Sequence, residues 1–460
     1  MMAYGVAAAI HSELFQKVFV SSDDPEIGRV AEWYGAEFIE RPAELATDTA
    51  QSIDAVTHVL RVSEAKGVQS EWLCQILPNC PLVTSADVVE HWEKFRTARR
   101  SFQISVVNYR CVYPEWALAG DVEGRGRWLW GREFLTRSQD LSSAVCPTGA
   151  VWWARREDLL AQNTFYGEPF HLQLIDANRG GGYRRRRRFA AGGIAGPRLD
   201  RSGRPISAGK NERELSAPGE NLTEGVMCAI PARGGSKRLP RKNLLELAGK
   251  PLIAHSIEAA QRSGFDEIYI CTDDSQIAEV AVKLGALVPQ LMPERLCGDL
   301  VASHVPCQFL ASELAKNGKS FQTLLCLQPS SPLRSCEDIQ QALEVFNRGV
   351  FDFVVSVTPI DPHYFHWAVA PVRGDYWKMF FGAEYMKERP LLPTVCRPNG
   401  SIKIARFSSL QAVGNFFGER LGVVETPENR SVHVATEFDL AICRAVLNEK
   451  VHAKSPGSAL

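Results

Sequence analysis

The sequence lacks an excess of either charge, a long apolar run and any closely spaced cysteine pair. Its 52 lysines and arginines are matched by 53 aspartates and glutamates, which argues against a broad contact with nucleic acid or an anionic membrane. No apolar run approaches the roughly 20 residues that a membrane-spanning helix needs. Residues 3–10 are apolar but follow no positive segment, so we expect no signal peptide. The 12 cysteines include no CxxC pair and are typical of reduced core thiols, which predicts a cytoplasmic protein.

The chain does contain an internal repeat. Residues 17–24, Lys-Val-Phe-Val-Ser-Ser-Asp-Asp, resemble residues 267–274, Glu-Ile-Tyr-Ile-Cys-Thr-Asp-Asp. A short amphipathic helical pattern follows each segment and ends in Gly-Ala, at residues 35–36 and 285–286. Residues 75–82 likewise match residues 328–333. These pairs indicate two copies of one module.

Each copy alternates short β-rich runs with helical patterns, which is typical of βαβ units. Residues 268–271, 324–327 and 354–357 have the composition of buried parallel strands. We therefore predict an α/β protein with a mostly parallel, Rossmann-like sheet in tandem copies, with ligand loops at the strand tips.

The expected domain boundaries follow from composition. We assign residues 1–178 to the first copy, 179–225 to a linker, 226–450 to the second copy and 451–460 to a tail. The linker is rich in Gly, Arg, Ser and Pro and contains five consecutive arginines at 184–188. These arginines are interpreted as a solvated linker, or as a patch for nucleic acid or an acidic partner.

The two copies differ at their starts. The second copy opens with an expected strand at 226–230 and a basic loop at 231–243, and the first copy has no counterpart of either. The first copy is thus a degenerate lobe, or its natural start lies upstream. The loop fits neither GxxxxGK[ST] nor GxGxxG. Its glycines allow tight turns that aim N–H groups at an anion, and its positive side chains would neutralise phosphate charge. These side chains are Arg233, Lys237, Arg238, Arg241 and Lys242.

Residues 230–243, together with Gly-Lys-Pro-Leu-Ile at 249–253, resemble the signature of the acylneuraminate cytidylyltransferases, which make CMP-sialic, CMP-legionaminic and CMP-pseudaminic acids. The resemblance covers residues 226–448 and, more weakly, residues 1–178. It implies an α/β nucleotidyltransferase of the glycosyltransferase-A-like kind and a homodimer, with CTP and a sugar acid as partners and no nucleic acid or membrane. It also implies transfer of CMP from CTP to a nine-carbon 2-keto sugar acid, with release of pyrophosphate and use of Mg²⁺.

The resemblance also implies roles for single residues. Arg233 and Lys242 would stabilise charge in catalysis. Nucleotide contacts would come from the loop and from a serine further on: Gly234, Gly235, Ser236, Asn243 and Ser303. Sugar contacts would come from Gln328, Arg397, Asn399, Phe416 and Phe417. Taken without the family, Gln328 fits a turn cap, Arg397 a surface ion pair, and the two phenylalanines a core.

One departure concerns the metal. The family usually carries an Asp-x-Asp pair that holds Mg²⁺, and this sequence has His433 and Ala435 at those positions. Glu437 and Asp439 lie nearby but at the wrong offset, so the metal ligands are unassigned. His433 is interpreted as a ligand or as a plain strand histidine.

Four functions follow. The first is an active synthetase working through the second copy, and the second is a pseudoenzyme that binds nucleotide or sugar acid without turnover. The third is a transferase acting on an eight-carbon keto acid, against which the Gly-Gly-Ser-Lys loop and Gln328 argue. The fourth is nucleic-acid binding through residues 184–188, which the net charge disfavours.

Overall fold

The computed structural model describes residues 1–47, 50–108, 114, 117–120, 125–128, 144–167, 170–176, 179, 222–360, 365–366, 368–373, 376–379 and 395–453. The five arginines at 184–188 and nearly all of the expected linker lie outside these residues. The chain divides into two compact units, unit 1 and unit 2, and each is assembled from separate segments of the chain. Unit 1 comprises Met1–Pro114, Ser138–Leu215 and Pro362–Pro393, and unit 2 comprises Glu115–Arg137, Ser216–Asp361 and Thr394–Leu460.

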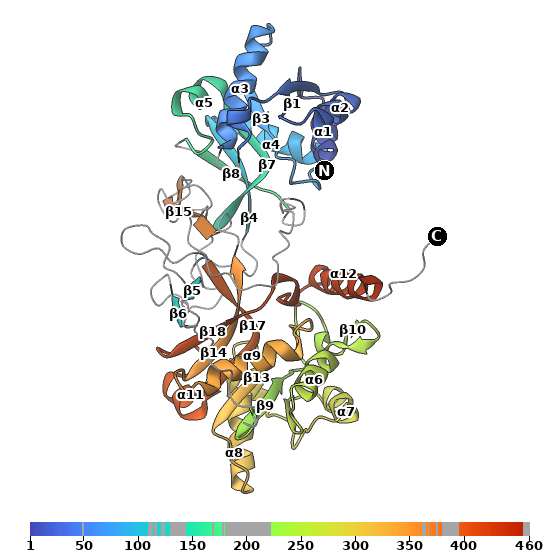
Figure 1. Ribbon diagram of the computed structural model, residues 1–460, viewed down its shortest axis with the longest axis vertical. Helices are drawn as coiled ribbons and strands as arrows, with labels where there is room; N and C mark the ends of the chain where they lie inside the picture. The colour runs from blue at the N-terminus through green and yellow to red at the C-terminus, as the bar shows by residue number, and fades with distance from the viewer. Residues whose placement is uncertain are drawn as a thin grey trace, which may run out of the picture. The chain divides into compact units, whose positions relative to one another are not determined.

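Unit 2 is built on a mixed sheet with the strand order β12-β9-β13-β17-β14-β18 (Figure 1). The strands β12, β9 and β13 pair in parallel, as do β14 and β18, and only β17 on this path runs antiparallel to its neighbours. The mostly parallel sheet predicted from the β-rich runs is therefore confirmed. The strands are β9 (Val226–Pro231), β12 (Ile268–Cys271), β13 (Thr323–Leu327), β14 (Phe353–Ile360), β17 (Val395–Arg406) and β18 (Leu421–Glu425).

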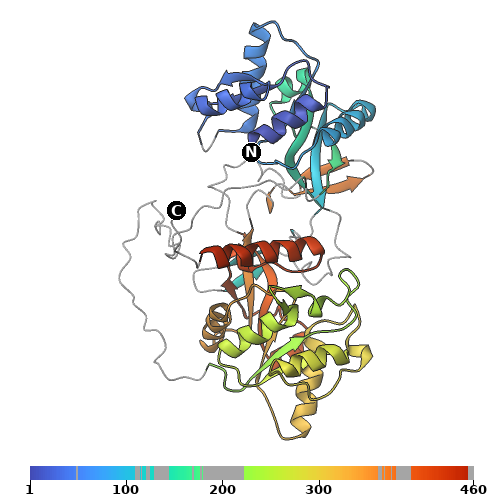
Figure 2. The ribbon, with the colours of Figure 1, turned by 90° about the vertical axis from the view of Figure 1, so that its right-hand side faces the viewer.

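Helices cover both faces of this sheet because successive strand residues are apolar on both sides. On one face, side chains such as Ile230 and Leu325 pack with α6, α7 and α9. On the other face, side chains such as Met227 and Leu324 pack with α8 and α11. A two-stranded hairpin and helix α12 complete the unit near the expected phosphate loop (Figure 2). These elements are α6 (Leu252–Arg262), α7 (Ser275–Lys283), α8 (His304–Lys316), α9 (Cys336–Asn347), α11 (Phe407–Val413), α12 (Glu437–Ala453), β10 (Glu246–Leu247) and β11 (Lys250–Pro251).

Unit 1 repeats part of this architecture in two separate sheets. Its larger sheet has the order β16-β15-β7-β4-β8, with β3 also paired to β7. Its smaller sheet contains only β1 and β2, which run parallel. The elements are α1 (Met2–His11), β1 (Phe19–Ser22), α2 (Pro25–Trp33), β2 (Glu37–Glu40), α3 (Ser52–Ala65), β3 (Trp72–Gln75), α4 (Ser85–Ala98), β4 (Phe102–Asn108), β7 (Val145–Arg155), α5 (Arg156–Gln162), β8 (Phe170–Leu174), β15 (Val369–Arg373) and β16 (Tyr376–Met379).

Local structure confirms that the copies repeat one module. Asp24 and Asp274 each cap the helix that follows the repeated segment, and Gly35 and Gly285 each adopt a left-handed conformation after that helix. The long antiparallel strands β7 and β17 correspond, and each faces a neighbour whose register shifts once, in β4 and in β14.

The copies exchange strands. Strands β5 (Leu118–Gly120) and β6 (Gly126–Trp128) come from the first copy in sequence but pair with β17 in the sheet of unit 2. Strand β15 comes from the second copy and pairs with β7 in the sheet of unit 1. Figure 1 shows both cases by colour, with teal β5 and β6 near red and orange strands and orange β15 near green β7.

Unit 1 has two sheets because no described strand joins β1 to β3. In unit 2, β9 lies between β12 and β13 and pairs with both. In the described part of unit 1, no strand lies between the corresponding β1 and β3. One edge of each strand therefore has no ladder partner among these residues.

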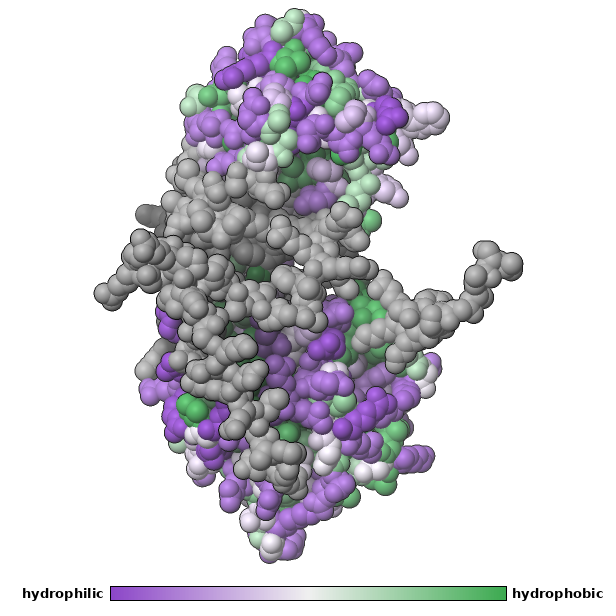
Figure 3. Space-filling view, in the orientation of Figure 1, coloured by the Kyte–Doolittle hydropathy of each residue, from purple (hydrophilic) through white to green (hydrophobic). Residues whose placement is uncertain are grey.

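The described surface and thiols agree with the composition. In the view of Figure 3 this surface is mainly hydrophilic, with small separate hydrophobic patches. No helix in the described ranges combines the length and the apolar character needed to cross a bilayer. None of the cysteines that the structure describes forms a disulfide, and most are buried.

We expect backbone amides of β1 to exchange with solvent at least about tenfold faster than those of β12, since open edges lower local stability. Strand β12 is bonded to β9 on one side and to Leu287 on the other. Hydrogen–deuterium exchange with peptide-level readout measures the difference, and β13 serves as a fully paired reference. Equal protection in β1 and β12 would contradict this account of unit 1.

Candidate active site

The predicted site residues of copy two converge on one edge of the unit 2 sheet. The carboxyl ends of parallel strands lie at the same edge, and loops after β9, β12 and β13 leave from it. Strand β17 runs the other way, with Ile402 opposite Leu327, so the β17 residues before Ile402 extend beyond the end of β13. The basic loop, Gln328 and the segment from Arg397 therefore come together although they are far apart in sequence.

The expected phosphate loop has a close backbone approach that requires glycine. A Cβ on Gly234 would lie 2.8 Å from a carboxylate oxygen of Asp274, and the Gly234 N–H donates to Asp273 over 2.8 Å. A Cβ on Gly235 would meet open space. The Ser236 N–H donates to the carbonyl of Gly234, which closes a tight turn. The loop thus presents its backbone at the sheet edge, where an anion can approach.

Arg233 is held at the start of this loop by an ion pair. Its guanidinium lies 2.8 Å from a carboxylate oxygen of Asp299, and Lys237 approaches the same carboxylate to 2.6 Å. These cations pull the pKa of Asp299 below its usual range, with the Lys237 hydrogen bond as the largest cause. Asp299 therefore balances the charge of Arg233 and Lys237 in this structure.

Lys242 and Asn243 lie on the short helix η4 (Lys242–Leu244) and tie the loop to the rest of unit 2. The Lys242 ammonium donates to the carbonyl of Val434 over 3.1 Å, and the Asn243 amide donates to the carbonyl of Arg233 over 3.0 Å. Burial lowers the pKa of Lys242 to about 8, with Arg238 and Arg233 adding to the effect. Asn243 is buried, so it supports the loop from below.

His433 lies at the centre of a group of positive charges. Burial first, and then four cations, lower its pKa to about 3: Lys242, Lys403, Arg238 and Arg397. We call these four side chains the cation cluster. His433 Nδ1 is 3.2 Å from the hydroxyl of Ser330, and the N–H of Val434 donates to the Ser330 carbonyl over 2.7 Å. Residues 431–434 form no strand, so the interpretation of His433 as a plain strand histidine is wrong.

Gln328 is positioned at the tip of β13 by a buried arginine. The Arg334 guanidinium donates to the Gln328 carbonyl and to the Ser401 carbonyl and Ser256 hydroxyl. Gln328 Oε1 accepts from the Ser330 hydroxyl over 3.4 Å, and a Cβ on Gly400 would lie 3.7 Å from it. The Gln328 side chain thus lies between the His433 segment and β17.

Asn399 lies in a buried network rather than at the surface of the site. It is 4% exposed, and its amide oxygen accepts from the Ser356 hydroxyl over 2.5 Å and the Ser401 N–H over 3.0 Å. Its amide nitrogen donates to the hydroxyls of Thr426 and Ser431. The side chain therefore joins β14, β17 and the segment that carries His433. Direct contact with a sugar hydroxyl stays a prediction.

The predicted aromatic pair divides between core and edge. Phe416 is 3% exposed in the core, with the Lys403 ammonium 5.4 Å from its ring centroid and the His304 ring at 5.8 Å. Phe417 is partly buried and meets Trp128 edge-to-face at 5.2 Å between centroids. Ser303 precedes α8 and makes no side-chain cap there. Sugar and nucleotide contacts of these residues stay predictions.

The structure adds residues that the sequence patterns did not indicate: Lys403 of the cation cluster, Ser330 beside His433, and Trp128. Lys403 could have been found, since a lysine between two isoleucines of a β-rich run, Ile402 and Ile404, is unusual. Trp128 could not, because nothing in the sequence pairs a residue of the first copy with Phe417.

The residues present do not fit a protein-held divalent cation. No group of three or more His, Cys, Asp or Glu side chains suited to a metal occurs in the described parts of the chain. Ala435 offers only a methyl group. Asp439 is used as a helix cap, accepting from the N–H groups of Ala435 at 3.0 Å and Thr436 at 2.8 Å. The acid pair that the resemblance implies for Mg²⁺ is therefore not present at positions 433 and 435, which are His and Ala.

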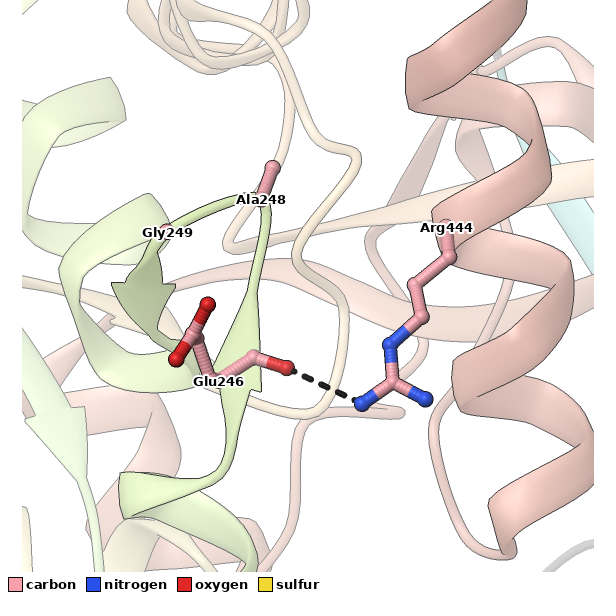
Figure 4. A pocket seen from close by; sticks show the side chains of 4 residues that line it. All are labelled: Glu246, Ala248, Gly249 and Arg444. Atoms are coloured by element: carbon pink, nitrogen blue, oxygen red, sulfur yellow. Dashed lines mark hydrogen bonds between the residues drawn. The ribbon is translucent and has the colours of Figure 1, made fainter.

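A separate hollow lies between the β10–β11 hairpin and α12, lined by Glu246, Ala248, Gly249 and Arg444 (Figure 4). Arg444 donates to the carbonyl of Glu246 there. None of the predicted site residues lines it.

Comparison with known proteins gives consistent matches. A family model described as Cytidylyltransferase matches residues 1–112 and 227–365. A pseudaminic acid cytidylyltransferase of Campylobacter jejuni is 40% identical over 136 residues, 29% of this chain and 59% of that relative. The CMP-N,N'-diacetyllegionaminic acid synthase of Legionella pneumophila is 36% identical over 230 residues, 48% of this chain and 96% of that relative. An N-acylneuraminate cytidylyltransferase of Streptococcus agalactiae is 34% identical over 46% of this chain and 51% of its own.

A solved CMP:2-keto-3-deoxy-manno-octonic acid synthetase complexed with CTP aligns with 49% of this chain and 99% of its own, at a TM-score of 0.37 and 18% identity. The chain spans only 59% of the length of the pseudaminic acid relative, but nearly all of the legionaminic acid relative.

Replacing Asn399 tests its network. Asn399→Ala removes the buried hydrogen bonds that Asn399 makes with Ser356, Thr426 and Ser431, and we expect this loss to lower the free energy of unfolding by about 2 kcal/mol. Urea denaturation followed by circular dichroism measures the change. Asn317→Ala, at an exposed helix end, is the matched control and should be close to neutral. A neutral Asn399→Ala would show that the network contributes nothing.

The position of Lys242 predicts that CTP affinity depends on pH. Its pKa of about 8 means that the ammonium loses its charge as pH rises through that value, whereas most lysines stay charged. CTP affinity at pH 9 should therefore be about tenfold lower than at pH 7. Isothermal titration calorimetry measures it, and Lys242→Arg should remove the pH dependence because arginine stays charged. A pH dependence that persists in Lys242→Arg would assign it elsewhere.

Proposed function

This chain belongs to the cytidylyltransferase family, and from that premise we propose that its second copy transfers CMP from CTP to a nine-carbon 2-keto sugar acid. The observation that carries the proposal is the convergence of the glycine-containing basic loop, Gln328 and the cation cluster at one sheet edge. A triphosphate and a sugar carboxylate are both anions, so this positive edge suits both substrates.

The proposed division of labour follows the geometry. The loop of Gly234, Gly235 and Ser236, with Arg233 and Lys242, binds the phosphates. Arg397 on β17 pairs with the sugar carboxylate, since a guanidinium matches a carboxylate with two parallel hydrogen bonds. Gln328 lies between the two regions, where it can orient the sugar hydroxyl.

The reaction needs positioning and charge stabilisation more than covalent help. The oxygen of the anomeric hydroxyl attacks the α-phosphorus, and the bond from that phosphorus to the bridging oxygen of pyrophosphate breaks. The hydroxyl proton is released and pyrophosphate leaves with its negative charge. Fixed cations stabilise the charge that develops on the phosphates. We assign no side chain as general base.

The names of the relatives support an acid of the sialic type, but they name three different acids: pseudaminic, N,N'-diacetyllegionaminic and N-acylneuraminic. We propose this class as the substrate. A cytoplasmic location and a homodimer stay predictions. The alternative is a pseudoenzyme that binds CTP or a sugar acid, and the loss of the acids at 433 and 435 favours it.

The test is pyrophosphate release from CTP in the presence of each of the three acids. Release with one acid supports the synthetase and identifies its substrate. Binding of CTP without release under any metal condition would instead support the pseudoenzyme.

Two variants assign the reaction to this site. Arg233→Ala and Lys242→Ala should each reduce turnover at least about tenfold, as expected for the loss of a charged stabilising group. Arg262→Ala, an exposed residue at the end of α6, is the matched control and should retain full turnover. Unchanged rates in both site variants would remove the nucleotide assignment.

A further inference from the structure

The segment that carries His433 differs electrostatically from a metal site. An ion with two positive charges needs anionic oxygen ligands, and this segment offers an imidazole, a methyl group and backbone. The cations of the cluster would repel it, and their effect falls off slowly in a partly buried site.

The nearby carboxylates are used within the protein. Asp273 accepts the Gly234 N–H, and Asp274 caps α7 through the N–H groups of Gln276 and Ile277. Asp299 pairs with Arg233 and Lys237. Each carboxylate thus holds the loop or a helix start, and none is directed at His433 by any contact in the structure.

Two of the cations are held by contacts within unit 2. Lys403 stands on β17 with its ammonium over the ring of Phe416, and Lys242 is anchored by the Val434 carbonyl. Both positions are on rigid elements, so holding a phosphate there costs little further ordering. Burial lowers the pKa of Lys403 as well, and a bound anion would offset that effect.

We propose that Arg238, Lys242 and Lys403 neutralise the nucleotide triphosphate in this chain in place of a protein-held divalent cation, which leaves Arg397 for the sugar carboxylate. This inference rests on the proposed function. In this proposal, positive side chains of the protein balance the negative charge of the phosphates, which a bound metal would otherwise balance. Nucleotide binding therefore does not depend on a divalent metal.

The direct experiment is calorimetric titration of the full chain with CTP in EDTA and in Mg²⁺. We expect dissociation constants within about threefold of each other, a small difference on the affinity scale. Pyrophosphate release should likewise continue in EDTA. Binding or release that requires Mg²⁺ would overturn this inference and leave the proposed function standing. Failure to bind CTP in either buffer would overturn both.

Variants locate the effect. Lys403→Met keeps the length of the side chain but removes its charge, so CTP affinity in EDTA should fall about tenfold. Lys242→Met should lower CTP affinity in EDTA by a similar factor. This second variant separates the loss of charge from a change in packing at Phe416. Lys283→Met, on exposed helix α7, is the control and should bind CTP normally. Unchanged affinity in both cluster variants, with the protein folded by circular dichroism, would overturn the inference.

A gain-of-site variant tests it from the other side. His433→Asp combined with Ala435→Asp introduces the acid pair, and Mn²⁺ binding followed by electron paramagnetic resonance needs no turnover. We expect the wild-type protein to bind Mn²⁺ at least about tenfold more weakly than the double variant, since only the variant offers carboxylates there. If the wild-type protein and the double variant bound Mn²⁺ with equal affinity, the wild-type protein would already hold a metal and the inference would be overturned.

Discussion

The hydrogen bond from Lys242 to the carbonyl of Val434 joins two segments separated by 192 residues, and the site depends on it. One partner belongs to the loop after β9, and the other belongs to the segment between β18 and α12. Val434 also belongs to a small apolar cluster, in which it packs with Leu239 and Leu440. The loop is therefore held by both packing and a charged donor, which fixes where the positive side chains stand.

The same arrangement has a cost in stability. Cations gathered at one edge repel each other when no anion lies between them, and a buried lysine loses solvation. Both effects favour the protein with its ligand bound. A ligand that binds only the folded chain adds its own binding free energy to that stability.

Much of the fold could be predicted from local patterns. The β-rich runs at 268–271 and 324–327 became β12 and β13, because buried parallel strands are apolar on both sides. The repeated Asp and Gly positions gave helix caps in both copies, since these residues act through local geometry. The basic loop was likewise recognisable, because glycines and cations after a strand have a local signature.

The rest depends on contacts that no local pattern encodes. Asn399 resembles a substrate ligand in sequence, but its neighbours in space use all of its polar atoms. The surroundings of His433 include four cations from two segments far apart in sequence, the basic loop and β17. The pairing of Leu118 with Cys396 joins residues of different copies, so neither copy's pattern contains it.

The exchange of β5 and β6 has a consequence for synthesis of the chain. These strands are made early, but their partner β17 and the side chains that cover Trp128 are made more than 260 residues later, an interval of tens of seconds at typical translation rates of about 5–20 residues per second. During that interval Leu118, which ends fully buried, has no native surface to cover it. The first half of this protein therefore stays incompletely folded until the second half has been synthesised.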